Sequence, residues 1–168
     1  MARSRAVVVA LLATASLGGW WLGRSGGGDT FQATVVATFD GDTIAVRAGG
    51  GRTGAVTVRL LGVDTPETHH PRRPVGCHGP SAAAATRRLL LGRRVRLTLD
   101  TQHHDRYGRL LAHVWLGRLH VNRWLLRHGH ARLLVIRPNT AYARRMLLDE
   151  LDARRRRVGL WGRCGTRW

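Results

Sequence analysis

The 168-residue chain contains no lysine and few acidic residues. All 28 basic residues are arginine, and ten Asp and Glu oppose them, which leaves a formal net charge of +18 at pH 7. This excess favours polyanionic partners, either nucleic acid or an anionic lipid surface. Arginine in place of lysine suits bidentate contacts to phosphate. GC-rich codons explain that replacement equally well, but they do not explain the excess of charge.

Residues 1–24 are expected to direct export. Arg3 and Arg5 precede an apolar run, and residues 13–15 offer small side chains at cleavage spacing, as in a secretory signal. The apolar stretch 6–23 is also long enough to reach the lower limit for a membrane span. A cleaved signal and a retained anchor both stay open, so the protein is expected to be secreted or anchored to the outer face of the cytoplasmic membrane. A glycine-rich linker, 25–30, then leads to the domain, 31–168.

Only two cysteines are present, Cys77 and Cys164. Neither has a partner at the spacing of a metal site, which argues against structural zinc. In an exported protein, two lone cysteines most simply form one disulfide. That bond would tie the C-terminus to a loop in the middle of the domain, and a loop of this length corresponds to about 4–5 kcal/mol in the chain-entropy model.

Hydrophobic alternation predicts five strands, at 31–39, 43–47, 55–63, 95–99 and 110–116. A helix that starts at Gly79 and ends at Gly92 separates the third strand from the fourth. Two more helices are expected near the C-terminus, at 121–128 and at 140–157. This order predicts an α+β fold that is mainly β: a five-stranded OB-type barrel with one helix after strand three and two C-terminal helices.

The scarce carboxylates are concentrated at strand ends. Four of the ten, namely Asp40, Asp42, Asp64 and Glu67, lie at the ends of the first and third strands. In a closed barrel the first strand pairs on both sides, so these ends can converge. Clustered oxygen ligands are what Ca²⁺ or Mg²⁺ requires, and a divalent ion beside arginines is what phosphoryl chemistry requires.

Three segments of the chain resemble motifs of the staphylococcal nuclease (thermonuclease) family. They are Phe39-Asp40-Gly41-Asp42-Thr43, Arg59-Leu60-Leu61-Gly62-Val63-Asp64-Thr65-Pro66-Glu67 and Asp105-Arg106-Tyr107-Gly108-Arg109. They occur in the family's order within residues 33–163, and the three together are far more specific than any one alone. The resemblance implies an OB-fold nuclease domain: a calcium-dependent endonuclease that cuts DNA, RNA or both and leaves 3′-phosphate ends.

The resemblance also implies a metal site. Asp42 and Asp64 are expected to bind Ca²⁺ through their carboxylates, and Thr65 through its main-chain carbonyl. Asp40 is expected close by, in the outer shell of the ion or holding one of its waters. Oxygen ligands exclude a thiolate-type site, and the preference for calcium over magnesium comes from the family.

The remaining matched residues are expected to act on the substrate. Glu67 would be the general base, while Arg59 and Arg109 would grip the scissile phosphate and stabilise the transition state. Arginine stays charged and its fork matches two phosphate oxygens. Arg106 and Tyr107 would contact the bound strand. The protein is expected to act as a monomer on DNA or RNA.

Two alternatives remain. A noncatalytic OB module that binds single-stranded nucleic acid needs stacking aromatics, yet aromatic residues make up only 6% of the chain. Such a module would also have no use for Asp42, Asp64 and Glu67. The segment 133–136 lacks the tyrosine with which the family often stacks on a nucleoside. A membrane-anchored basic protein that holds an acidic polymer would explain the charge but not the motifs.

Overall fold

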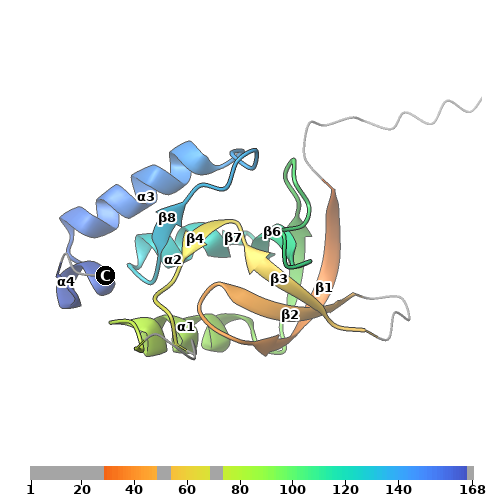
Figure 1. Cartoon of the computed structure of the whole chain (residues 1–168), viewed down its shortest axis with the longest axis horizontal. Coiled ribbons are helices and arrows are strands. Elements are labelled where there is room, and N and C mark those ends of the chain that lie inside the picture. Colours follow the sequence, from red (N-terminus) through yellow and green to blue (C-terminus); the bar gives the residue numbers. More distant parts are fainter. Residues whose placement is uncertain (1–28, 49–53, 69–73, 166–168) are drawn as a thin grey trace, which may run out of the picture.

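The computed structural model describes residues 29–48, 54–68 and 74–165 (Figure 1). Five strands form a closed barrel, because β1 pairs antiparallel with both β2 and β5, and a parallel pairing of β3 with β6 completes the ring. These strands are β1 (Thr30–Thr38), β2 (Thr43–Ala48), β3 (Val56–Leu60), β5 (Arg94–Thr98) and β6 (Leu110–Leu116). The predicted α+β fold with an OB-type barrel is confirmed.

Alternation decides which side chains of β1 enter the barrel. Ala33 and Val35 are buried, whereas Thr34 and Val36 face outward. The register with β2 shifts at Val36, which is the extra residue of a β-bulge. A bulge bends its strand and increases its twist, so the end of β1 turns just before Asp40.

The prediction of a single strand at 55–63 was wrong, because the segment forms two strands, β3 and β4 (Gly62–Asp64). The chain turns at Gly62, which has a φ of +74° that a residue with a side chain adopts only at a cost. A Cβ at that position would also collide with Met146. The short β4 therefore leaves the barrel and pairs antiparallel with β8 (Arg132–Leu134), a strand that the sequence did not suggest. A further short strand, β7 (Leu119–His120), folds back on β6.

Helices cover two sides of the barrel (Figure 1). The predicted α1 (Gly79–Leu90) lies at the bottom of the view, and α2 (Val121–Arg127) starts and ends near its expected limits. At the top, α3 (Ala143–Arg155) is shorter than the expected 140–157, because residues 140–142 form a turn and Arg157 has a positive φ. The four-residue α4 (Leu160–Arg163) is too short to produce a periodic pattern, and it was not predicted.

Buried polar contacts join the helices to the barrel. Asn122 is fully buried on α2, accepts a 2.8 Å hydrogen bond from the Val114 amide and donates one of 2.8 Å to the Leu61 carbonyl. Asp149 of α3 accepts hydrogen bonds from Arg123 and Arg127 of α2. These contacts fix the C-terminal helices against the junction of β3 and β4.

The expected disulfide is present between Cys77 and Cys164, whose Cα atoms are 5.8 Å apart. The expected signal or anchor and most of the linker lie outside the described residues, and β1 begins at Thr30, one residue before the expected start of the domain. Within the described part of the chain, no helix combines the length and apolarity needed to cross a bilayer.

Candidate active site

The carboxylate of Asp40 stabilises the turn between β1 and β2. Asp40 Oδ1 accepts hydrogen bonds from the amides of Asp42 at 2.9 Å and Thr43 at 2.6 Å, the Asx pattern that closes tight turns. The fully buried Thr86 of α1 donates its hydroxyl to the Gly41 carbonyl at 2.7 Å. The turn is thus fixed from inside by Asp40 and from below by α1.

Asp42 is buried and its two oxygens have different partners. Oδ2 accepts hydrogen bonds from the amide and hydroxyl of Thr65 at 2.7 and 3.0 Å, and Oδ1 lies 3.2 Å from Nε of Arg59. Burial raises the pKa of Asp42, with a smaller rise from Asp40, and the positive charge of Arg59 and the hydrogen bonds from Thr65 oppose that rise. The contact with Thr65 brings the end of β4 against the β1–β2 turn, as expected for a closed barrel.

Arg59, on β3, is a buried arginine held by the backbone. Its Nη1 donates to the carbonyls of Leu60 and Val63 at 2.8 and 2.6 Å, and its Nη2 lies 3.5 Å from Asp64 Oδ1. Carbonyl acceptors fixed by the backbone keep the guanidinium in place, so little side-chain entropy is lost when it binds a ligand.

Asp64 lies at the end of β4, where it meets an arginine that the sequence did not single out. Arg132 is its partner in the register of β4 with β8, and Arg132 Nη2 lies 3.2 Å from Asp64 Oδ2. The Asp64 side chain is 37% exposed, so it is the more accessible of the two carboxylates expected to bind metal.

Glu67 lies between β4 and α1, and residues close to the start of α1 contact its backbone. The Gly76 amide donates to the Glu67 carbonyl at 2.7 Å, and the Thr68 amide donates to Glu67 Oε1 at 3.0 Å. Gly79 packs so closely that a Cβ there would lie 2.9 Å from the same carbonyl. This packing fixes the direction in which the Glu67 side chain leaves the loop.

The loop before β6 presents Arg109. Asp105 accepts hydrogen bonds from the amides of Tyr107 and Arg109, and its Oδ2 lies 2.7 Å from Nε of Arg109. Burial acts to raise the pKa of Asp105, but the hydrogen bonds from Arg109 and Tyr107 outweigh it and hold the pKa below its ordinary value. Asp105 therefore stays ionised and orients Arg109.

These residues meet in one cleft of about 150 Å³, which we call the carboxylate–arginine cleft. Seven of the nine residues expected at the site line it. The lining consists of Asp40, Asp42, Thr43, Arg59, Asp64, Thr65, Pro66, Glu67 and Arg109.

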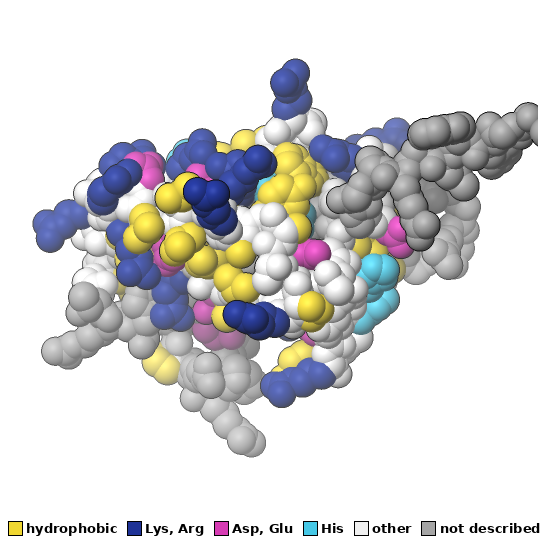
Figure 2. Space-filling view, turned by 90° about the horizontal axis from the view of Figure 1, so that it is seen from above, with side chains coloured by type: hydrophobic (Ala, Val, Ile, Leu, Met, Phe, Trp, Pro, Cys, Tyr) yellow, Lys and Arg dark blue, Asp and Glu magenta, His cyan; other side chains and the backbone are white. Residues whose placement is uncertain are grey.

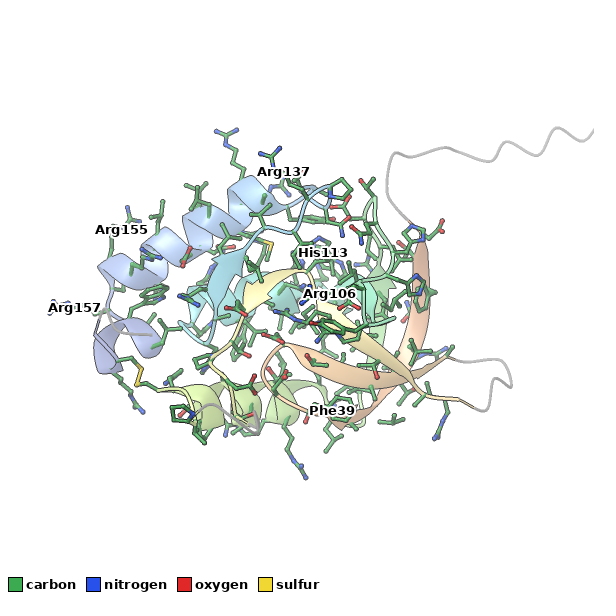
Figure 3. The ribbon with its side chains drawn as sticks, in the orientation of Figure 1. Phe39, Arg106, His113, Arg137, Arg155 and Arg157 are labelled. Atoms are coloured by element: carbon green, nitrogen blue, oxygen red, sulfur yellow. A yellow bond between two sulfur atoms is a disulfide. The ribbon has the colours of Figure 1, made fainter. Side chains whose placement is uncertain are left out.

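The other two expected residues, Arg106 (labelled in Figure 3) and Tyr107, are exposed and do not belong to this lining. The Arg106 guanidinium stacks 4.8 Å from the centre of the Tyr107 ring.

The donors in the cleft are oxygen atoms of carboxylates, a hydroxyl and the backbone, a set that fits Ca²⁺ or Mg²⁺ and not a thiolate-loving ion. Within the described ranges, no three acidic, His or Cys side chains form a preformed cage. Asp42 and Asp64 are instead held by Arg59, Arg132 and Thr65. A hard cation with its own waters is compatible with such a site, whereas an ion that needs four protein ligands is not.

Comparison with known proteins gives consistent matches. The family model described as "Staphylococcal nuclease homologue" matches residues 57–163. The chain is 41% identical over 127 residues to a thermonuclease of Staphylococcus hyicus (76% of this chain, 73% of the relative) and 40% identical over 131 residues to one of Staphylococcus intermedius (77% and 75%). It is 37% identical over 136 residues to the endonuclease YncB of Bacillus subtilis (strain 168), covering 80% of this chain and 63% of the relative.

Proposed function

The chain belongs to the staphylococcal nuclease family, and from that premise we propose that it is a nuclease whose active site is the carboxylate–arginine cleft. The observation that carries the proposal is that Glu67 lines the same cleft as Arg59 and Arg109. A phosphodiester bound there would lie beside a carboxylate that can accept a proton and beside two fixed guanidinium groups that can bind its oxygens. Attack of water on phosphorus requires a base and positive charges of this kind.

Glu67 is proposed as the general base. Its carboxylate would take the proton of the attacking water, and the hydrogen bond from the Thr68 amide to Oε1 fixes one of its oxygens. Geometry of this kind matters because general bases act within hydrogen-bond reach of the proton that they remove.

Arg59 and Arg109 are proposed to stabilise the extra negative charge that develops on the phosphate oxygens in the transition state. Both are held in advance, Arg59 by carbonyl oxygens and Asp42, and Arg109 by Asp105. Preorganised charges stabilise a transition state without a cost of reorganisation during the reaction. Arg106 and Tyr107 would contact the strand where it leaves the cleft.

A divalent cation would be held by Asp42, Asp64 and the Thr65 carbonyl. Asp40 would lie in the outer shell of the ion or hold one of its waters. When bound, such an ion neutralises phosphate oxygens and makes a coordinated water more acidic. The mixture of carboxylate and backbone donors suits the irregular coordination of Ca²⁺ better than the strict octahedron of Mg²⁺. We therefore propose Ca²⁺ as the cofactor, and DNA and RNA cut to 3′-phosphate ends as the reaction.

We further propose that the protein is exported. The support is the Cys77–Cys164 disulfide, because such bonds persist in oxidising compartments and are rare in the cytosol.

The test is digestion of plasmid DNA and of RNA by the full chain with Ca²⁺, with Mg²⁺ or with excess chelator. Cutting is expected with Ca²⁺ and is expected to disappear with chelator and in Glu67→Gln. The matched control is Asp152→Asn, the same change of carboxylate to amide on the exposed side of α3, which is expected to cut normally. Binding of single strands without cutting, insensitive to chelator, would instead indicate a noncatalytic binding module.

A further inference from the structure

The outward side of α3 carries leucines where a solvated helix carries polar residues. Leu147, Leu148 and Leu151 are 43%, 59% and 44% exposed. The inward side is already complete, because Met146, Asp149, Glu150 and Ala153 are buried. The three leucines are not among the buried residues of the core, and a group of exposed apolar side chains marks an interaction surface.

Arginines frame these leucines at both ends. Arg144, Leu148, Leu151 and Arg155 follow the spacing i, i+4, i+7 and i+11, so they share one face of the helix. Arg155 projects away from the protein in Figure 3, and its Nη2 lies 3.1 Å from Oδ1 of Asp152, the residue four positions after Leu148. Figure 2 shows the corresponding surface, on the left of the view, as yellow apolar side chains bordered by dark-blue arginines.

The surface extends beyond α3. Leu134 and Val135, at and just after the end of β8, are also about two-fifths exposed, and Arg137 follows them on the same upper side of the molecule (Figure 3). The first described residues of β1 lie on that side too, whereas α1 lies opposite (Figure 1). The residues that precede them in the sequence contain the apolar stretch 6–23, for which a cleaved signal and a retained anchor are both open.

We propose that the outer face of α3, formed by Arg144, Leu147, Leu148, Leu151 and Arg155, docks parallel to an anionic lipid bilayer. The leucines would enter the boundary between headgroups and acyl chains, and the arginines would contact lipid phosphates. A helix with an apolar strip framed by basic residues binds at interfaces in this way, and each Arg near an anionic surface adds electrostatic attraction. The proposal does not depend on the nuclease function.

The pattern of apolar and charged side chains favours lipid over other partners. Nucleic acid would match the arginines but would place phosphates against three leucines. A protein partner would be expected to bring carboxylates of its own to this face, which carries arginine at both ends. A bilayer offers the apolar layer and the anionic layer at the depths that such a helix requires.

The experiment places an environment-sensitive fluorophore on the full chain. Cys77 and Cys164 are bonded to each other, so a single added thiol in Leu148→Cys can be labelled with a nitrobenzoxadiazole dye. The matched control is Arg88→Cys, an exposed position on α1. Each protein is mixed with phosphatidylcholine vesicles, with vesicles of phosphatidylcholine and phosphatidylglycerol in equal parts, and with duplex DNA.

The proposal expects a blue shift and at least about a twofold rise in emission at position 148 on anionic vesicles only, because the dye enters an apolar layer. No change is expected at position 88. Equal responses at both positions, no response at 148, or a response to DNA equal to that on vesicles would overturn it.

A second variant separates the leucines from general charge attraction. Leu147→Gln/Leu151→Gln, labelled at 148, is expected to lose most of the rise in emission on anionic vesicles, since each leucine removed from the interface weakens insertion of this face, whereas residues 6–23 are the same in both proteins. Cleavage of soluble DNA by this variant is expected to match that of the parent, which shows that the fold is intact. An unchanged rise in emission at 148 would refute insertion by the leucines.

Discussion

The amide of Gly76 donates a 2.7 Å hydrogen bond to the carbonyl of Glu67, and Cys77, the next residue, is bonded to Cys164 near the C-terminus. Gly79, two residues further, packs on the same carbonyl. The disulfide therefore holds a short segment whose two ends both contact the backbone of the proposed general base. It links the position of Glu67 to the C-terminal helices, because α4 is itself attached to α2 through the Leu160 amide and the Gly129 carbonyl.

Replacement of both cysteines, Cys77→Ser/Cys164→Ser, is expected to lower stability and turnover together. The chain-entropy model gives a loss of about 4–5 kcal/mol for a loop of this length, measurable by denaturant unfolding. At a temperature where the variant is folded, we expect kcat to fall while KM changes little, because Glu67 acts on water and not on strand binding.

The control for that variant is Leu97→Ala, which removes a fully buried side chain of β5, a strand that pairs with β1 and β6, and costs about 2–5 kcal/mol. Leu97→Ala is expected to keep its kcat under the same conditions. If both variants lose kcat equally, the disulfide supports only global stability.

Thr86→Val is expected to loosen the turn that carries Asp40 and Asp42. The Thr86 hydroxyl donates a buried hydrogen bond of 2.7 Å to the Gly41 carbonyl, and valine cannot replace it. A buried carbonyl left without a donor lowers the free energy of unfolding by about 1–3 kcal/mol. Calcium affinity, measured by calorimetry, is expected to fall along with the free energy of unfolding. Thr86→Ser keeps the hydroxyl and should retain the affinity; if it loses as much as Thr86→Val, packing and not the hydrogen bond fixes the turn.

Asp105→Asn is expected to impair catalysis with little effect on strand binding. The neutral amide cannot pair with Arg109, whose Nε lies 2.7 Å from the carboxylate, so the guanidinium loses its fixed orientation. We expect kcat to fall by about tenfold or more, the usual scale for a misplaced electrostatic group. Arg106→Gln, on the exposed part of the same loop, should raise KM and spare kcat. A higher KM with normal kcat in Asp105→Asn, together with a lower kcat in Arg106→Gln, would contradict the roles assigned to Arg109 and Arg106.

Local signals were enough to predict the carboxylates of the cleft. Asp42 and Asp64 lie at strand ends that the chain marks with glycine and alternation, and closure of the barrel brings these ends together. Arg59 and Arg109 were predicted only through the resemblance to the family, because a lone arginine on a strand or loop is usually a solvated side chain. Arg132 could not be predicted, because it reaches Asp64 through the pairing of two three-residue strands that are too short to alternate. Thr86 was equally hidden, since its partner is a backbone carbonyl 45 positions away and nothing in the alanine-rich α1 distinguishes its hydroxyl.

Two buried histidines are expected to make the fold sensitive to mild acid. His113 on β6 and His120 on β7 lie 3.2 Å apart through Nδ1 and Nε2. Burial lowers the pKa of His113 to about 4 and, with the neighbouring His113 adding to the effect, lowers the pKa of His120 to about 3. Burial also lowers the pKa of His130 to about 4. All three are therefore neutral in the folded protein at pH values where the unfolded chain binds protons.

The sign of the effect follows from linkage. Since the folded pKa values lie below the ordinary value of 6.5, the unfolded state takes up protons first as the pH falls, and the free energy of unfolding decreases between pH 6.5 and about 4. Each histidine contributes at most about 1.4 kcal/mol per pH unit in that window. The depressed pKa of Asp149 acts only below its ordinary value of 3.8, so it does not account for a loss at pH 5.

His120→Phe isolates one of these groups. Phenylalanine can keep the stack on Trp115, whose ring centre is 4.2 Å from that of His120, and it removes Nδ1, which is buried without a hydrogen-bond partner among the described residues. We expect the slope of unfolding free energy against pH, measured by urea titration from pH 4 to 7, to fall by at most about 1.4 kcal/mol per pH unit, because one buried histidine that the folded state keeps neutral is gone. His103→Asn, an exposed position, should leave the slope unchanged. If His120→Phe retains the full slope, the acid sensitivity originates in groups other than this buried pair.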